Sequence, residues 1–421
     1  MADTDWDLII VGAGAAGIGA GITARAAGLS AKVFEAAPRI GGRAFTRRLG
    51  GLPFDVGCHY LHHVGRNPFA AVALARKLPL RYDLAALPTA GVLVRHGERS
   101  SEAERQAAEE VFEAAFDVLE HEAPDDVALS TLLDTASPHY PLVRAWFAAH
   151  YGSPPERMSA LDLWRNEDGP YDWPVASGYG ALITSLGEEL DVALETPVTE
   201  VRRAKRRVEV VTAQGTATAR AVLVTVSTEV LRAGAIRFSP GLPDAVTTAL
   251  DGVRLGHAER VGFHTQGRLV GEDFPLGAHV EFGDGQALQL YLHEFGDPIV
   301  TVYLAGEVAR DLATEGSGAV IEVAEQAIVD VVGEKARSRL GGRMTSGWTT
   351  DPHILGGYSI VLPGRADDRE TLTEPFDARI RLAGEACSIE HFGTAHGAWA
   401  TGIEQVNAWI EEGILTPARP A

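Results

Sequence analysis

Asp7-Leu-Ile-Ile-Val-Gly-Ala-Gly-Ala-Ala-Gly17 is the stretch of this 421-residue sequence that decides its fold. The apolar run that ends at Val11 predicts a short buried strand, and the glycines after it predict a turn. The segment from Ala15 to Ala27 predicts a helix that stops at Gly28, because glycine is common just past a helix end. Ala31 to Glu35 predicts a second, parallel strand. The N-terminus is therefore predicted to be a βαβ unit.

The glycines of the turn have the spacing of a dinucleotide-binding loop. Gly12 permits the tight turn, Gly14 lets a pyrophosphate approach the backbone, and Gly17 lets the helix pack closely on the strand. Free N–H groups at the helix start attract phosphates. Glu35 follows Gly17 by eighteen residues and is expected to accept hydrogen bonds from ribose hydroxyls. The alternative is a packing turn without a ligand. The loop residues expected at the cofactor are Gly12, Gly14, Ala15, Ala16 and Gly17.

A second glycine turn, Ile40-Gly-Gly-Arg43, follows the ribose acid closely. Gly41 and Gly42 permit another close approach of the backbone to a ligand, and Arg43 can pair with a phosphate. A plain glycine turn with a surface arginine is the structural alternative. The position directly after Glu35 favours the phosphate role.

The composition is that of a globular protein with an acidic surface. The net charge is −20 and the pI is about 5.1, which disfavours nucleic acid and anionic membranes as partners, although acidity also simply keeps a protein in solution. Asp3, Asp5 and Asp7 stand where a signal peptide needs basic residues, and no apolar stretch has the length of a membrane span. Two cysteines form no disulfide framework, which agrees with a cytoplasmic location. The oligomeric state is left open.

The remaining pattern predicts an α/β protein whose cofactor domain is discontinuous. Helices are predicted from Ser101 to Glu122, Ala319 to Val332 and Ala395 to Glu411, and an antiparallel sheet between Val261 and Val302. A Rossmann-type domain is expected in three parts, at residues 1–85, 174–240 and 372–421. An inserted α+β substrate domain is expected to have a helical part at 86–173 and a part with a mixed or antiparallel sheet at 241–371.

These motifs, taken in order from Asp7 to Trp409, resemble the flavin-containing amine oxidases, which include monoamine oxidases, polyamine oxidases and lysine-specific histone demethylases. The matching pieces are discontinuous but collinear. The resemblance implies FAD as the cofactor. Neither Cys58 nor Cys387 lies in a context like the covalent attachment site of monoamine oxidases, so the FAD is expected to be non-covalent.

Further cofactor residues are implied by this resemblance. Gly384 and Glu385, in Leu382-Ala-Gly-Glu385, resemble the pair that contacts the ribityl or phosphate region. Thr394 and Ala395, in Gly393-Thr-Ala-His-Gly-Ala-Trp399, resemble the helix start whose amides face the flavin ring. A helix N-terminus there stabilises negative charge on the flavin. The other positions implied are Val198 beside the adenine, and Gly57, Cys58 and His59 in the loop along the flavin ring.

The sequence departs from the family pattern at the expected substrate site. The lysine that usually reaches flavin N5 through a water is replaced by Arg260, which stays protonated and is no base. We expect Arg260 either to face the flavin or to turn away and pair with a carboxylate such as Glu259. Tyr358 is expected to form one wall of the amine cavity. Thr394 stands where many members have a second aromatic wall.

Three histidines in Cys58-His-Tyr-Leu-His-His63 are the remaining candidates for chemistry. By register from Gly57, His62 matches a position where polyamine oxidases carry Glu or His near the amine, and an imidazole with a reference pKa of about 6.5 can accept a proton. The alternative is that these histidines cap a loop. No sulfur or acidic partner has a known ligand spacing, so no metal is predicted.

The reaction implied by the resemblance is oxidation of a carbon–nitrogen bond in a small-molecule amine. A neutral amine passes a hydride from its α-carbon to flavin N5, the imine is hydrolysed, and oxygen reoxidises the flavin. One alternative is a flavin-dependent desaturase or isomerase of the phytoene desaturase or protoporphyrinogen oxidase type, which shares the terminal motifs. The other is a non-catalytic FAD-binding protein, an interpretation supported by the missing lysine.

Overall fold

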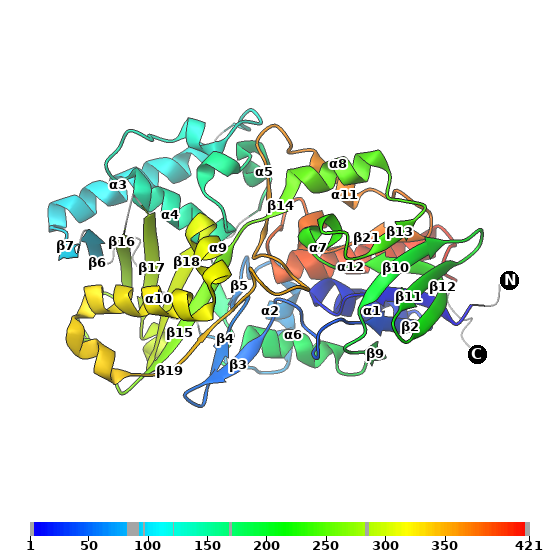
Figure 1. Ribbon diagram of the computed structural model, residues 1–421, viewed down its shortest axis with the longest axis horizontal. Coiled ribbons are helices and arrows are strands. Elements are labelled where there is room, and N and C mark those ends of the chain that lie inside the picture. Colours follow the sequence, from blue (N-terminus) through cyan, green and yellow to red (C-terminus); the bar gives the residue numbers. More distant parts are fainter. Residues whose placement is uncertain are drawn as a thin grey trace.

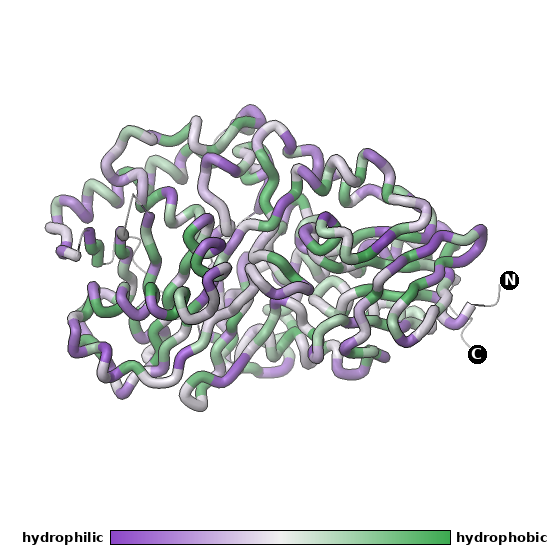
Figure 2. The backbone as a smooth tube through the Cα atoms, viewed as in Figure 1, coloured by the Kyte–Doolittle hydropathy of each residue, from purple (hydrophilic) through white to green (hydrophobic). Residues whose placement is uncertain are grey.

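The computed structural model describes residues 4–81, 92–95, 97–120, 122–167, 171–282 and 286–416. The expected domain boundary at residue 85 lies outside the described residues. The chain forms two lobes side by side, and both termini lie at the far end of one of them (Figure 1). Apolar segments run through the strands inside both lobes, whereas hydrophilic residues gather on outer helices and turns (Figure 2).

The first lobe is built on an eight-stranded sheet with the order β13-β10-β11-β12-β1-β2-β9, in which β21 also pairs with β12. β1 pairs in parallel with β2 on one side and β12 on the other, as a Rossmann-type sheet requires. The strands are β1 (Trp6–Val11), β2 (Ala31–Phe34), β9 (Val192–Ala193), β10 (Val198–Arg203), β11 (Val208–Thr212), β12 (Gly215–Val224), β13 (Arg237–Ser239) and β21 (Ile380–Leu382).

Helices α1 (Ala15–Ala26) and α12 (Ala395–Glu411) pack against each other beside this sheet (Figure 1). Glycines make the close approach possible. A Cβ added at Gly402 would lie 2.1 Å from the carbonyl oxygen of Ala16, and one at Gly19 would lie 2.9 Å from the carbonyl oxygen of Trp399. The two ends of the sequence are thus joined in one core, which places the motif after β21 beside the motif after β1.

The second lobe is built on a seven-stranded sheet with the order β19-β15-β18-β17-β16-β6-β7. All neighbours are antiparallel except β6 and β16, which are parallel, so the sheet is mixed as expected. Its strands are β6 (Val92–Arg95), β7 (Glu98–Arg99), β15 (Ala258–Thr265), β16 (Gly277–Phe282), β17 (Gln286–Leu292), β18 (Ile299–Ala305) and β19 (Leu340–Thr345). Helix α10 (Ser317–Val332) packs on this sheet.

Further helices and short strands connect the lobes and complete their surfaces. The remaining helices are α2 (Pro68–Ala75), α3 (Glu102–Glu120), α4 (Tyr140–Tyr151), α5 (Ala160–Trp164), α6 (Tyr179–Gly187), α7 (Thr228–Arg232), α8 (Asp244–Gly252), α9 (Gly306–Glu315), α10 (Ser317–Val332) and α11 (Asp368–Thr373). The remaining strands are β3 (Thr46–Leu49), β4 (Leu52–Asp55), β5 (Tyr60–Leu61), β8 (Trp173–Pro174), β14 (Val253–Leu255) and β20 (Ser359–Val361).

The helices and strands predicted from contiguous residues agree with the structure. The predictions that depend on pairing between distant segments agree less well. Helix α12 has the predicted bounds, and β1, α1 and β2 differ from prediction by one residue at an end. Strand β12 begins at Gly215 because it extends into a hairpin with β11. Strands β6 and β7 lie in the range 86–173, which was expected to be helical. Among the described residues, no helix is long and apolar enough to cross a membrane.

Candidate active site

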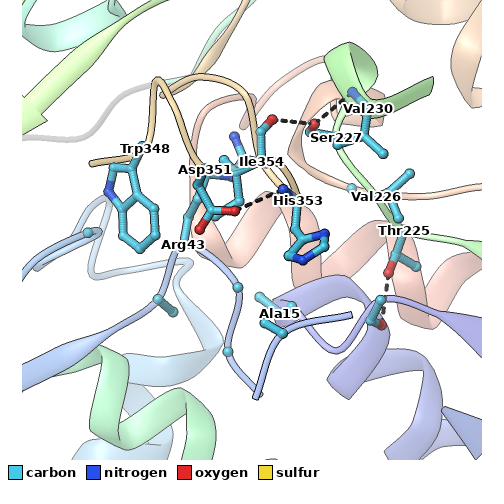
Figure 3. Close-up of a pocket in the computed structure, with 18 of the residues that line it drawn as sticks. Ala15, Arg43, Thr225, Val226, Ser227, Val230, Trp348, Asp351, His353 and Ile354 are labelled. Carbon is cyan, nitrogen blue, oxygen red and sulfur yellow. Dashed lines mark hydrogen bonds between the residues drawn. The ribbon is translucent and has the colours of Figure 1, made fainter. Parts of the chain in front are cut away.

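A cavity of about 360 Å³ runs from the turn after β1 to strands β15 and β18 of the second lobe. Its lining comes from segments far apart in the sequence, including residues 34–44, the loop 56–59, residues 225–227 and the start of α12. Figure 3 shows one end, where Ala15 at the start of α1 lies below Thr225 and the segment from Trp348 to Ile354. The carboxyl ends of parallel strands open onto this cavity, which is where open α/β sheets bind ligands.

The glycine turn has the geometry of a ligand cradle. Gly12 has a φ of +105°, and a Cβ at Gly17 would lie 2.0 Å from the Gly12 carbonyl oxygen, so both positions are closed to larger residues by the chain itself. A Cβ at Gly14 would meet nothing within 4 Å, although Gly14 lines the cavity. Gly384, which follows β21, also lines the cavity, and a Cβ there would likewise meet nothing within 4 Å. The space at Gly14 and Gly384 fits a dinucleotide approaching the start of α1.

Glu35 lines the cavity but is already bound to the backbone. Its Oε2 accepts a hydrogen bond from the Ala13 N–H at 2.7 Å, and its Oε1 accepts one from the Ala37 N–H at 2.8 Å. Each carboxylate oxygen keeps a further acceptor position. The side chain therefore fixes the loops on either side of the cavity and still presents an acceptor to it.

Arg43 and Glu385, both expected at the cofactor, contact each other. The Arg43 guanidinium donates to Glu385 Oε1 at 2.9 Å and to the Gly357 carbonyl oxygen. Glu385 Oε2 accepts from Ser359 Oγ at 2.6 Å and from the Gly393 N–H at 2.8 Å. Burial alone would raise the pKa of Glu385, but Arg43, Ser359 and Arg369 together hold it below its usual value. Glu385 thus remains an anion that joins three segments of the cavity wall.

This network continues into the helical region through a fully buried arginine. Arg369 donates to Ser359 Oγ at 2.9 Å and forms two hydrogen bonds, of 2.8 and 2.9 Å, with the carboxylate of Asp162 on α5. Arg369 is 0% exposed and Asp162 is 3% exposed. Two buried charges of opposite sign stabilise the fold only as a pair, because loss of either one leaves the other uncompensated.

Thr394 and Ala395 form the start of α12 at the cavity. The hydroxyl of Thr394 accepts from the Gly397 N–H at 3.0 Å and donates to the His391 carbonyl oxygen at 2.7 Å. Thr394 is therefore the N-cap of the helix. The expected cofactor residues Val198, Gly57, Cys58 and His59 also line the cavity, as do Gly41 and Gly42. Burial raises the pKa of the Cys58 thiol, which keeps it protonated.

At its other end the cavity is walled by Arg260, Tyr358, His59 and Tyr303. Arg260 does not turn to the surface. Its guanidinium donates to the Asp55 carbonyl oxygen and lies 3.6 Å from the Glu294 carboxylate. Glu259 instead accepts hydrogen bonds from Ser346, Gly347 and Thr349. A buried cation therefore stands beside the cavity, next to its own counterion.

His62 is not among the described residues that line this cavity. Its Nδ1 lies 2.9 Å from Asp172 Oδ2, and its side chain is 43% exposed. His59, three positions earlier, does line the cavity, and its Nε2 is hydrogen-bonded to Tyr303 Oη at 2.9 Å. Burial and then the nearby Arg260 hold the pKa of His59 well below its usual value, so its ring is neutral.

Several lining residues were not predicted from sequence motifs. Tyr303 lies on β18, where alternation places Val300, Val302 and Leu304 in the core and Tyr303 on the opposite face. Trp348 both packs in the core and lines the cavity. The segment from Asp351 to Ile354 is held over the cavity, as Figure 3 shows, by the hydrogen bond from Ser227 Oγ to the Ile354 carbonyl oxygen.

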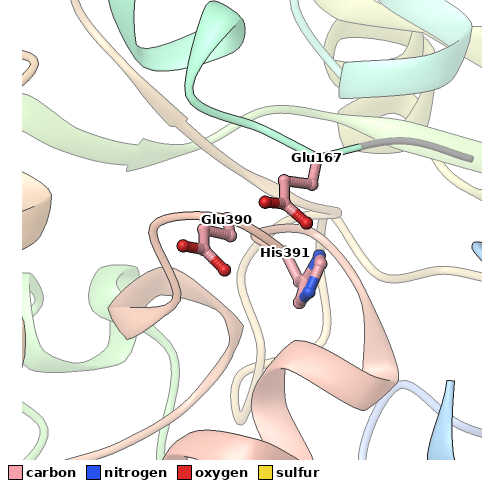
Figure 4. A group of neighbouring side chains, drawn as sticks. All are labelled: Glu167, Glu390 and His391. Carbon is pink, nitrogen blue, oxygen red and sulfur yellow. The ribbon is translucent and has the colours of Figure 1, made fainter. Parts of the chain in front are cut away.

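One group of potential metal ligands occurs among the residues that the structure describes. Glu167, Glu390 and His391 have ligand atoms within 4.8 Å of one another (Figure 4). Both glutamates are exposed, and Glu167 is already paired with Arg66. Exposed acidic groups of this kind are common without an ion, so the group by itself does not define a metal site.

The fold and the cavity define a dinucleotide-binding oxidoreductase of the discontinuous Rossmann type. Residues 10–78 match the NAD(P)-binding Rossmann-like domain. Residues 93–409 match the flavin containing amine oxidoreductases, and since this is most of the chain, the protein belongs to that family. It is an FAD-dependent oxidoreductase, and its FAD is bound non-covalently.

The chain is also similar to polyamine oxidases and histone demethylases along nearly all of its length. It is 28% identical to polyamine oxidase 4 of Oryza sativa subsp. japonica, over 94% of this chain and 87% of the relative. It is 27% identical to probable polyamine oxidase 4 of Arabidopsis thaliana, over 94% and 85%. Lysine-specific histone demethylase 1 homolog 2 of Arabidopsis thaliana is 24% identical, over 96% of this chain but 58% of the relative.

Proposed function

We propose that this enzyme oxidises the carbon–nitrogen bond of a small-molecule amine, with oxygen as the electron acceptor. The net reaction converts an amine, water and oxygen into a carbonyl compound, a shortened amine and hydrogen peroxide. The observation that carries the proposal is that one cavity joins the glycine cradle to a pocket walled by Tyr358, Tyr303, His59 and Arg260. The names of the relatives favour polyamines as the first substrates to test.

The proposed cofactor residues act through shape and charge. Gly12, Gly14 and Gly17, with the start of α1, would hold the pyrophosphate, and Glu35 would accept from the ribose. The start of α12, at Thr394 and Ala395, would place its N–H groups at the flavin ring. Val198, Gly57, Cys58 and the Arg43–Glu385 pair complete this surface. Bound FAD supplies the two-electron acceptor for the oxidation.

The proposed substrate residues hold the amine in an uncharged state. Arg260 remains protonated, since the nearby Tyr303, Glu294 and Asp55 outweigh the effect of its burial on its pKa. A fixed cation repels an ammonium ion and so favours the neutral amine, the form that can lose a hydride. Tyr358 provides an aromatic wall. His62, which pairs with Asp172, acts from outside the cavity lining and not at the reacting atoms.

A peroxide assay tests the proposal against its rivals. The purified holoenzyme is incubated in air with spermine, spermidine, benzylamine and a set of L-amino acids, and hydrogen peroxide is measured together with the carbonyl product. We expect peroxide and carbonyl in equal amounts with at least one amine. Oxidation of a carotenoid or a porphyrinogen without any amine activity would instead favour the desaturase class.

A further inference from the structure

Tyr303 and His59 form a hydrogen-bonded pair in the cavity wall, and Tyr303 is not among the residues expected at the cofactor. Tyr303 projects from β18, and His59 lies in the loop between β4 and β5. Tyr303 Oη and His59 Nε2 are 2.9 Å apart, and both residues line the cavity. The ring of Tyr291 packs edge-on against the ring of Tyr303 with centroids 5.6 Å apart. This contact helps to fix the position of the Tyr303 ring.

The direction of this hydrogen bond follows from the state of the imidazole. The ring of His59 makes a hydrogen bond to the Gly57 backbone that favours its protonated form, so the ring donates there. A neutral imidazole has one donor nitrogen and one acceptor nitrogen. The neutral tautomer with its proton on Nδ1 leaves Nε2 as the acceptor, and in this tautomer the Tyr303 hydroxyl donates to Nε2 over the 2.9 Å that separates them.

The proton of the Tyr303 hydroxyl is therefore already used in the hydrogen bond to His59. The hydroxyl oxygen can only accept a further hydrogen bond. The four carboxylates that line the cavity within the described residues are all bonded inside the chain: Glu35, Glu259, Asp351 and Glu385. The cation of Arg260 lies 5.5 Å from the centre of the Tyr303 ring, which disfavours a charged donor at the phenol.

We propose that Tyr303, oriented by His59, is the hydrogen-bond acceptor that selects uncharged amines bearing an N–H group. The inference rests on the proposed amine oxidation and adds a specificity-determining residue to it. An N–H donated to Tyr303 Oη leaves the nitrogen lone pair free, as loss of hydride from the adjacent carbon requires. His59 acts through Tyr303 and is a positioning residue.

The test compares benzylamine with N,N-dimethylbenzylamine, which has no N–H group when uncharged. Dissociation constants are measured by anaerobic rapid mixing of the holoenzyme with each amine, from the perturbation of the flavin spectrum before the flavin is reduced, at one alkaline pH, and are referred to the uncharged form of each amine. One neutral hydrogen bond corresponds to about a five- to tenfold preference for benzylamine. Tyr303→Phe keeps the ring and should abolish this preference.

Two further variants separate the acceptor from general effects on packing. Tyr291→Phe is the matched control, because the Tyr291 hydroxyl is bound by Gln289 Nε2 at 2.7 Å and Tyr291 is not among the described lining residues. It should keep the parental preference. His59→Gln supplies an amide oxygen that accepts the phenol proton and should also keep it, whereas His59→Ala should lose it.

The outcomes distinguish this proposal from the proposed function. If the parent binds both amines equally, or if Tyr303→Phe keeps the preference, the assignment of Tyr303 is wrong even when amines reduce the flavin. If Tyr291→Phe or His59→Gln loses the preference together with Tyr303→Phe, the effect is one of packing and the assignment is also wrong. If no amine is oxidised at all, the proposed function fails on its own assay.

Discussion

Gly14, the N-cap of α1, and Gly17, in its first turn, stand three residues apart, and the structure predicts different effects when each is changed to alanine. A Cβ at Gly17 would lie 2.0 Å from the Gly12 carbonyl oxygen and 3.3 Å from Ile10 Cγ2. The nearest atom belongs to the backbone, so rotation of a side chain cannot relieve this clash. We expect Gly17→Ala to lower the free energy of unfolding by about 3 kcal/mol, the upper end of the usual cost of overpacking.

Gly14→Ala should leave the fold intact and weaken the binding of FAD. Gly14 has an extended backbone (φ −74°, ψ −174°) that any residue adopts, and its added Cβ would meet no atom of the chain within 4 Å. The folding cost is therefore that of Ala in place of Gly at an N-cap, under about 1 kcal/mol. The methyl group would occupy the space assigned to the pyrophosphate, so we expect at least a tenfold loss of affinity, about 1.4 kcal/mol.

Urea unfolding followed by circular dichroism measures the first effect, and titration of the apoprotein with FAD measures the second. The reasoning is refuted if Gly14→Ala unfolds as early as Gly17→Ala, or if Gly14→Ala binds FAD as tightly as the parent. Either result would mean that the open space at Gly14 is not where the dinucleotide approaches the backbone.

Four other predictions follow from the buried polar network and the cavity. Arg369→Met should cost about 3–5 kcal/mol in urea unfolding, because Asp162 is left buried without its counterion, and a loss below about 1 kcal/mol contradicts this. Glu35→Ala should weaken FAD binding by about 1–3 kcal/mol, measured by titration of the apoprotein; unchanged affinity removes Glu35 from the site. The pKa of Glu385 is lowered in the fold from its ordinary value of 4.5, so the Glu385 carboxylate stabilises the fold above that pH, and this stabilisation is lost as the pH falls through the folded pKa. Glu385→Gln should therefore make the free energy of unfolding depend less on pH on the acid side, and an unchanged pH dependence would refute the lowered pKa. Arg260→Met should lower the flavin reduction potential measured by equilibration with a redox dye, because it removes a cation beside the cavity, and an equal potential in both proteins would mean that Arg260 is too far from the flavin to act on it.

The parts of the fold that the sequence predicts are those encoded in contiguous residues. The unit from β1 to β2 has its strand, turn and helix signals within thirty positions, and α12 has a cap at Thr394 followed by regular apolar spacing. Strand β6 was not predicted to join the second sheet, because its partner β16 lies far along the chain and short apolar runs give no pairing partner. Long-range pairing depends on tertiary packing rather than on local propensity.

The candidate site was predictable where a motif exists and not where contacts are long-range. Arg43 and Glu385 were each identified from their motifs, but their ion pair spans 342 positions and turns Arg43 away from the purely phosphate-binding role that its motif indicates. Tyr303 belongs to no motif. Strand alternation places it on the face opposite the core, which is a signal that could have identified it as exposed, but not as part of this cavity.

Anaerobic titration of the holoenzyme with an amine is the most direct test of the claim that this cavity brings an amine to FAD. The amine is the one that produces peroxide in air, and the flavin absorbance is recorded before and after oxygen is admitted. The account predicts that about one equivalent of amine bleaches the flavin completely and that oxygen restores the spectrum with release of one equivalent of peroxide. A flavin that dithionite bleaches but that the amine leaves oxidised would contradict it.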